Sequence, residues 1–91
     1  MKYREDFVND AIGAICAELV KAEGKFPGWP LDPVHGAAIL GEESGELTQA
    51  CLDYFYGRYS QLDRMAREAA QVGATAIRFL VGLNELREKP E

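Results

Sequence analysis

Residues 32–83 read DPVHGAAILGEESGELTQACLDYFYGRYSQLDRMAREAAQVGATAIRFLVGL, and this stretch decides the fold. Its apolar residues recur every three to four positions, which is the period of one face of an α-helix. It opens on Asp32-Pro33, a good helix start, because aspartate caps free backbone amides and proline suits the first turn. Gly57 is a stop signal between two such patterns, which predicts an antiparallel helical hairpin. The predicted helices span residues 33–55 and about 61–83.

A third helix is predicted ahead of this hairpin, from about Tyr3 to Ala22. Its apolar residues again follow the helical period. They are Phe7, Val8, Ala11, Ile12, Ile15, Cys16, Leu19 and Val20. Prolines and glycines interrupt residues 23–32, which therefore form a loop. The polar tail, residues 84–91, adds a last helical turn or frays. The sequence thus predicts a single all-α domain over residues 1–91. Its architecture is a helical bundle of three main helices, with room for a short fourth, completed by oligomerisation.

The length and the charge limit the classes of function. A chain of 91 residues buries only roughly 60–65% of the surface that its unfolded form exposes, so we expect self-association. Fifteen acidic against ten basic residues give a formal net charge of −5. Such a balance argues against a binder of nucleic-acid polymers, which normally carries a basic face. It leaves a nucleotide substrate open, because a divalent metal reverses the local sign of an acidic cleft.

No membrane or export signal is recognisable in the sequence. No stretch approaches the roughly 18 apolar residues that span a bilayer, and the N-terminus lacks the apolar core of a signal peptide. We therefore expect no membrane partner and a cytoplasmic location. Cys16 and Cys51 lie in apolar helical patterns outside any CxxC pair, so we expect free, buried thiols.

Two glutamates in the first helix of the hairpin form the first candidate site. Glu43 and Glu46 are three residues apart, so they project from the same side of a helix, one turn apart. Like charges at this spacing repel, and a divalent cation would offset that repulsion directly. Mg²⁺ prefers oxygen ligands at about 2.0–2.1 Å and keeps several waters for exchange with phosphate. The alternative is a solvated acidic helix face without a ligand.

A third glutamate joins this pair if the hairpin closes about Gly57. Glu46 precedes Gly57 by about 11 residues and Glu68 follows it by about 11, which places both about 16 Å from the hairpin tip. Gln71 follows Glu68 by one turn on the same side. We therefore predict that Glu43, Glu46 and Glu68 converge on one ion, with Gln71 beside them.

Residues of the loop and of the last helix are candidates for binding a substrate. Phe26 and Trp29 are large aromatics in a loop, so they either plug the helix ends or form a wall that stacks on a nucleotide base. Lys25 and Arg78 are the cations expected to contact phosphate. For Arg78 the alternative is a salt bridge at the surface.

Two motifs resemble those of the MazG-like family of all-α nucleoside triphosphate pyrophosphohydrolases. LGEESGEL, residues 40–47, resembles the family's ExxE motif, and REAAQVGA, residues 67–74, resembles its ExxD motif. The resemblance covers roughly residues 30–81 and the order of the helices. It implies a helical bundle that forms a homodimer or a homotetramer. It also implies Mg²⁺-dependent cleavage of a nucleoside triphosphate between its α- and β-phosphates, giving a nucleoside monophosphate and pyrophosphate.

The resemblance also assigns roles to individual residues. Glu43 and Glu46 take the ExxE positions and Glu68 takes the first position of ExxD, all as ligands of magnesium. A water oriented by a carboxylate, either Glu46 or Glu42, would attack phosphorus.

The second acidic position of ExxD is Gln71 in this sequence. Glutamine keeps a carbonyl oxygen for the metal but removes one negative charge, so we expect weaker magnesium binding or fewer ions. Glu42 is a candidate further ligand, and Asp53, two turns from the ExxE motif, is a more distant one. Two other functions stay open. The first is a non-catalytic member of the same fold that binds a nucleotide or a protein partner. The second is a helical oligomerisation module whose glutamates only face solvent.

Overall fold

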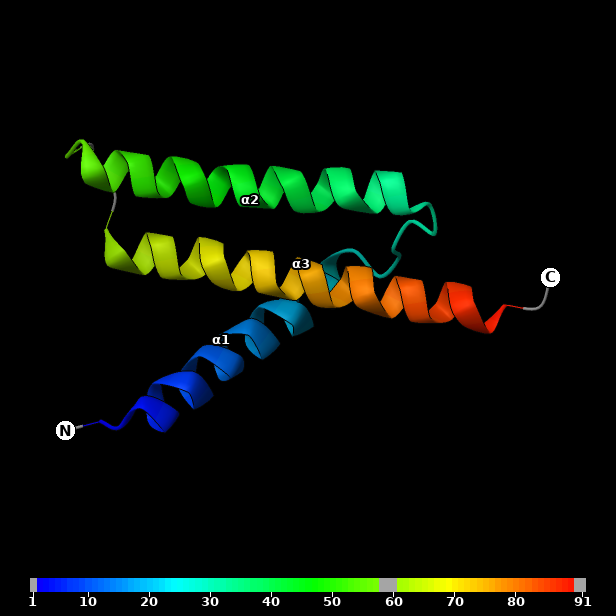
Figure 1. Cartoon of the computed structure of the whole chain (residues 1–91), viewed down its shortest axis with the longest axis horizontal. Coiled ribbons are helices and arrows are strands. Elements are labelled where there is room, and N and C mark those ends of the chain that lie inside the picture. Colours follow the sequence, from blue (N-terminus) through cyan, green and yellow to red (C-terminus); the bar gives the residue numbers. More distant parts are fainter. Residues whose placement is uncertain (1, 58–60, 90–91) are drawn as a thin grey trace.

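The structure, a computed structural model, describes residues 2–57 and 61–89 and folds them into three helices (Figure 1). They are α1 (Arg4–Lys25), α2 (Pro33–Phe55) and α3 (Leu62–Glu88). No strand occurs in the two described ranges, so the predicted all-α class is confirmed. The helices α2 and α3 run antiparallel, side by side, and α1 lies obliquely against α3 (Figure 1).

The boundaries of α2 match the predicted ones, and local chemistry explains both ends. Asp32 Oδ1 accepts a hydrogen bond of 3.0 Å from the Val34 amide and so caps the helix start. At the other end, Gly57 adopts a φ of +70°, a left-handed conformation that glycine takes at little cost. α3 starts after Gln61, and in the described residues it continues to Glu88, so the tail extends this helix and forms no fourth one.

The seam between α2 and α3 is built from small side chains. Its buried alanines are Ala50, Ala70 and Ala74. No large side chain among the described residues is fully buried. Near the turn, Asp53 accepts hydrogen bonds from Gln49 of its own helix (2.8 Å) and from Arg64 of α3 (2.9 Å). This pairing ties the two helices together and fixes the height at which their side chains face each other.

Trp29 inserts between the hairpin helices at the end far from the turn. A Cβ on Gly82 of α3 would lie 2.7 Å from Trp29 Cδ1, and a Cβ on Gly36 of α2 would lie 3.3 Å from Trp29 Cζ2. Both glycines are buried, so the indole occupies the space that side chains there would need. Trp29 therefore packs between the two helices, whereas Phe26 keeps 59% of its surface exposed.

Among the described helices, α1 is held by α3 alone. Ile15 packs against Gly73, where an added Cβ would lie 2.8 Å from Ile15 Cδ1. No residue of α1 is buried. The apolar side chains of Phe7, Ile12 and Val20 leave 59%, 53% and 73% of their residue surface exposed. Much of the apolar surface of α1 is therefore uncovered in the single chain.

The chain is open for its length. Its radius of gyration is 15.3 Å, where a compact domain of this length would have roughly 12 Å. Its accessible surface is 6929 Å², where a compact monomer of this mass would expose roughly 5300 Å². The prediction of buried thiols is wrong for this reason, since Cys16 and Cys51 are free but exposed. No helix within the described ranges combines the length and the apolar character required to cross a membrane.

Candidate metal centre

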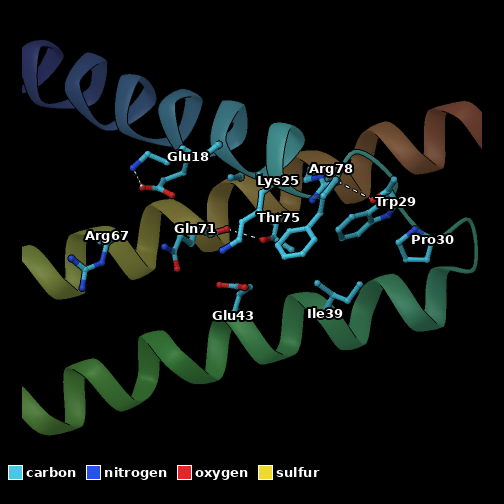
Figure 2. A pocket seen from close by; sticks show the side chains of 15 residues that line it. Glu18, Lys25, Trp29, Pro30, Ile39, Glu43, Arg67, Gln71, Thr75 and Arg78 are labelled. Carbon is cyan, nitrogen blue, oxygen red and sulfur yellow. Dashed lines mark hydrogen bonds and ion pairs between the residues drawn. The ribbon is translucent and has the colours of Figure 1, made fainter.

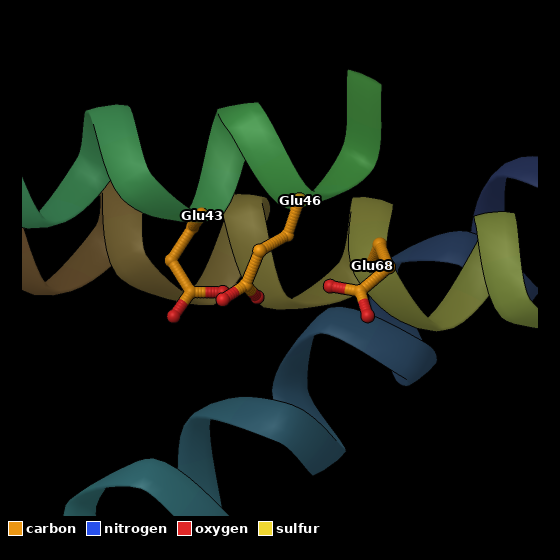
Figure 3. A group of neighbouring side chains, drawn as sticks. All are labelled: Glu43, Glu46 and Glu68. Atoms are coloured by element: carbon orange, nitrogen blue, oxygen red, sulfur yellow. The ribbon is translucent and has the colours of Figure 1, made fainter. Parts of the chain in front are cut away.

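Three carboxylates meet on the hairpin, as predicted from the turn at Gly57 (Figure 3). Glu43 and Glu46 come from adjacent turns of α2, and Glu68 comes from α3. One oxygen from each of the three lies within 4.8 Å of the other two. Glu43 and Glu68 are half-buried, and Glu46 is the exposed member of the group. We call these three residues the glutamate cluster.

Two oxygens of the glutamate cluster are buried without a partner. Oε2 of Glu43 and Oε2 of Glu68 have no contact with solvent and no hydrogen-bond donor. Leaving a buried acceptor unpaired costs free energy, and the cost is larger for a charged group. A bound cation would remove this cost. Hard carboxylate oxygens converging from two helices fit Mg²⁺, which prefers oxygen ligands.

The electrostatics of the cluster act most strongly on Glu43. Burial raises the pKa of the Glu43 carboxyl, and the nearby carboxylates of Glu46, Glu68 and Glu42 raise it further. A positive charge at the cluster would act in the opposite direction, because an opposite charge favours the ionised form. The unpaired oxygens and the raised pKa both reflect a local excess of negative charge at the cluster.

Of the three residues expected to assist the glutamate cluster, only Gln71 lies beside it. Gln71 lies near Glu43, and both line the same pocket (Figure 2). Gln71 also accepts a hydrogen bond of 2.8 Å from Thr75 through its backbone oxygen, which leaves its side-chain amide available. Glu42 is exposed and outside the cluster. Asp53 is engaged with Gln49 and Arg64 near the turn, so it does not supply the charge that Gln71 lacks.

A pocket of about 600 Å³ adjoins the cluster. It is bounded by α1, the loop, α2 and α3, with Arg67 toward one end, Trp29 toward the other, and Glu43 between them (Figure 2). Its basic lining residues are Lys21, Lys25, Arg67 and Arg78. Lys21 and Arg67 were not among the predicted residues. Lys21 was detectable from its spacing of four to Lys25, which puts both on one helix face. Arg67 directly precedes Glu68 in the second acidic motif, and its position there carries no separate signal for the pocket.

Arg78 forms a salt bridge with Glu23, as the alternative expected, but it does not lie at the surface. It is buried, with 7% of its surface exposed. Its Nη2 donates hydrogen bonds to the carbonyl oxygens of Phe26 and Gly28. The guanidinium therefore serves the loop in this structure, and its contact with phosphate stays a prediction.

Comparisons of the chain with protein-family models, with curated proteins and with solved structures gave no match. The resemblance to the MazG-like family thus rests on the two acidic motifs and on the order of the helices. The geometry defines a class of protein. It is an all-α protein with a cluster of three glutamates at the side of a pocket.

In the metal-free protein, Glu43→Gln is expected to raise the free energy of unfolding near neutral pH. Because the folded-state pKa of Glu43 is raised above its ordinary value of 4.5, ionisation of Glu43 disfavours the folded state. This cost is absent below a pH of 4.5, grows as the pH rises toward the folded-state pKa, and is complete above it. Urea unfolding in EDTA at a series of pH values should show the advantage of E43Q disappearing on acidification.

Glu85→Gln is the control for this measurement, because Glu85 is an exposed carboxylate of α3 away from the cluster. It should change stability little at any pH. A wild type that is more stable than E43Q near neutral pH without metal would contradict the electrostatic description of the cluster.

Proposed function

We propose that this protein is a magnesium-dependent nucleoside triphosphate pyrophosphohydrolase. One observation carries the proposal: Glu43 and Glu68 hold buried, unpartnered carboxylate oxygens beside Glu46, at the side of a pocket that has both basic and aromatic lining. The choice of the bond between the α- and β-phosphates follows the resemblance to the MazG-like family. The products would be a nucleoside monophosphate and pyrophosphate.

The three residues of the glutamate cluster would hold the metal, with the Gln71 amide oxygen as a neutral further ligand. Bound Mg²⁺ would neutralise phosphate charge and stabilise the charge that develops during the reaction. Glu46, which is exposed, would orient a water and accept its proton, with Glu42 as the second candidate. The water oxygen would bond to the α-phosphorus as the bond to the bridging oxygen breaks, and pyrophosphate would leave.

The pocket suits the rest of such a substrate. Its volume of about 600 Å³ falls within the range of small-molecule sites. Phe26 and Trp29 offer aromatic surface for a base. Lys21, Lys25 and Arg67 also line the pocket, and their positive charges would favour a triphosphate there.

We also propose that the protein acts as a homodimer or a homotetramer. The uncovered apolar residues of α1 and the excess of accessible surface support this proposal. The excess on one chain is about twice the roughly 800 Å² that each partner buries in a standard-sized interface.

A non-catalytic nucleotide binder is the second candidate. Gln71 favours it, because it lines the pocket near Glu43 where an acidic side chain would strengthen metal binding. An assay separates the two candidates. The purified protein is incubated with standard and chemically modified nucleoside triphosphates and Mg²⁺, and both products are measured.

We expect equal amounts of pyrophosphate and nucleoside monophosphate from at least one nucleotide, and no product in EDTA. Thermal stabilisation by Mg²⁺ and nucleotide without any product would identify the non-catalytic binder, because a ligand of the folded state raises stability by mass action. The absence of both effects would leave an oligomerisation module.

A further inference from the structure

Arg78 makes contacts that the proposed hydrolysis does not use. Its side chain is only 8% exposed. Nη2 donates to the carbonyl oxygens of Phe26 and Gly28, the latter at 3.0 Å (Figure 2). Nε lies 3.2 Å from a carboxylate oxygen of Glu23, at the end of α1. The guanidinium carbon lies 5.2 Å from the centre of the Trp29 ring. One side chain of α3 thus joins the end of α1 to the loop.

The loop lacks the regular backbone hydrogen bonds that order a helix or a strand. Residues 26–32 form neither helix nor strand, and Pro27 and Pro30 have no backbone N–H to donate. Arg78 satisfies two of the loop carbonyls from 50 and 52 residues away in the sequence. Arginine suits this task, because its planar guanidinium presents several donors in a fixed geometry and stacks on aromatic rings.

The same loop builds the aromatic end of the pocket. Phe26, Gly28 and Trp29 line the pocket together with Arg78. We infer that Arg78 is a positioning residue that holds this aromatic end in place before a ligand arrives. The inference rests on the proposed function in one respect: it takes the ligand at this end to be the base of a nucleoside triphosphate. A wall that is already ordered favours binding, because less chain has to be ordered by the ligand.

Arg78→Lys tests the inference, because lysine keeps the charge but loses the planar fork of donors. Trp29 is the only tryptophan of the chain, so its fluorescence reports on the loop. Without any ligand, R78K should show red-shifted emission and stronger quenching by acrylamide than the wild type. In the hydrolysis assay, the KM for the nucleotide should rise about tenfold while kcat falls less, since the loop would be ordered only on binding.

Arg87→Lys is the matched control on the same helix. Arg87 is exposed, donates to Asn84 in the last turn of α3, and does not line the pocket. R87K should match the wild type in fluorescence and in KM. Wild-type quenching together with wild-type KM in a folded R78K protein would overturn the inference.

Two further outcomes are decided separately. If circular dichroism shows that R78K does not fold, nitrogen NMR of the wild-type side chains decides: the Arg78 guanidinium should give resolved signals protected from exchange. Signals averaged like those of the exposed Arg67 would overturn the inference. If the wild type hydrolyses no nucleotide, the proposed function fails, while the ligand-free fluorescence of R78K still confirms or overturns the role of Arg78.

Discussion

Glu68→Gln is expected to lower kcat/KM for the nucleoside triphosphate by about 10²–10³-fold or more, the loss typical of removing one group that stabilises transition-state charge. Glu68 is the single member of the glutamate cluster that comes from α3, and its Oε2 is one of the two buried, unpartnered oxygens. Glutamine keeps the size and one carbonyl oxygen but removes the charge. The cluster would then hold its cation from one helix only.

The loss should arise from chemistry and metal binding and not from unfolding. Without metal, E68Q should be at least as stable as the wild type, because the substitution removes repulsion toward Glu43 and Glu46. Glu85→Gln, on the same helix but outside the cluster, should keep wild-type kinetics. A folded E68Q protein as active as the wild type would remove Glu68 from the site.

Ile12→Glu is expected to convert the oligomer into monomers of 10.1 kDa. Ile12 is 53% exposed in the single chain, so the charge costs the fold itself little. Buried in an interface without a partner, the same carboxylate would cost several kcal/mol, enough to dissociate most assemblies. Light scattering coupled to size-exclusion chromatography measures the change in mass.

Ala17→Glu is the control for the oligomer. Ala17 is also exposed, and it lies about 140° around α1 from Ile12. A17E should keep the wild-type mass. A wild type that elutes as a monomer at micromolar concentration would contradict the proposal that a partner covers α1.

The convergence of the three glutamates was predictable because it depends on the limits of the helices and on the regular rise per residue. The limits of α2 follow from Asp32-Pro33 at one end and Gly57 at the other, which are local signals. Once those limits hold, equal spacing from the turn brings Glu46 and Glu68 to one height. The convergence of the glutamate cluster could therefore be predicted from the spacing of these residues along the chain.

The parts that were missed depend on contacts between distant segments. Gly36 and Gly41 look alike in the sequence, yet only Gly36 packs against Trp29, while Gly41 has open space around it. Arg78 lies on the same side of its helix as the predicted site, but its partner is a loop carbonyl 52 residues earlier. Such pairings follow from the docking of the loop between α2 and α3, which has no periodic signal in the sequence.

The period of apolar residues in α1 predicted a helix with an apolar face, and the helix is present. The spacing of the apolar residues does not indicate whether the surface that covers them belongs to the same chain or to another copy. In the single chain α3 covers part of that face through Ile15, and residues such as Phe7 stay uncovered.

The most direct test of the central claim is anomalous diffraction from crystals of the wild-type protein soaked in Mn²⁺, which shares the preference of Mg²⁺ for oxygen ligands. The expected result is an anomalous peak bounded by carboxylate oxygens of Glu43, Glu46 and Glu68, at roughly the 2.0–2.1 Å that Mg²⁺ prefers, and no such peak in crystals of E68Q. Saturating Mn²⁺ without a peak between these three carboxylates would contradict the assignment of a metal centre.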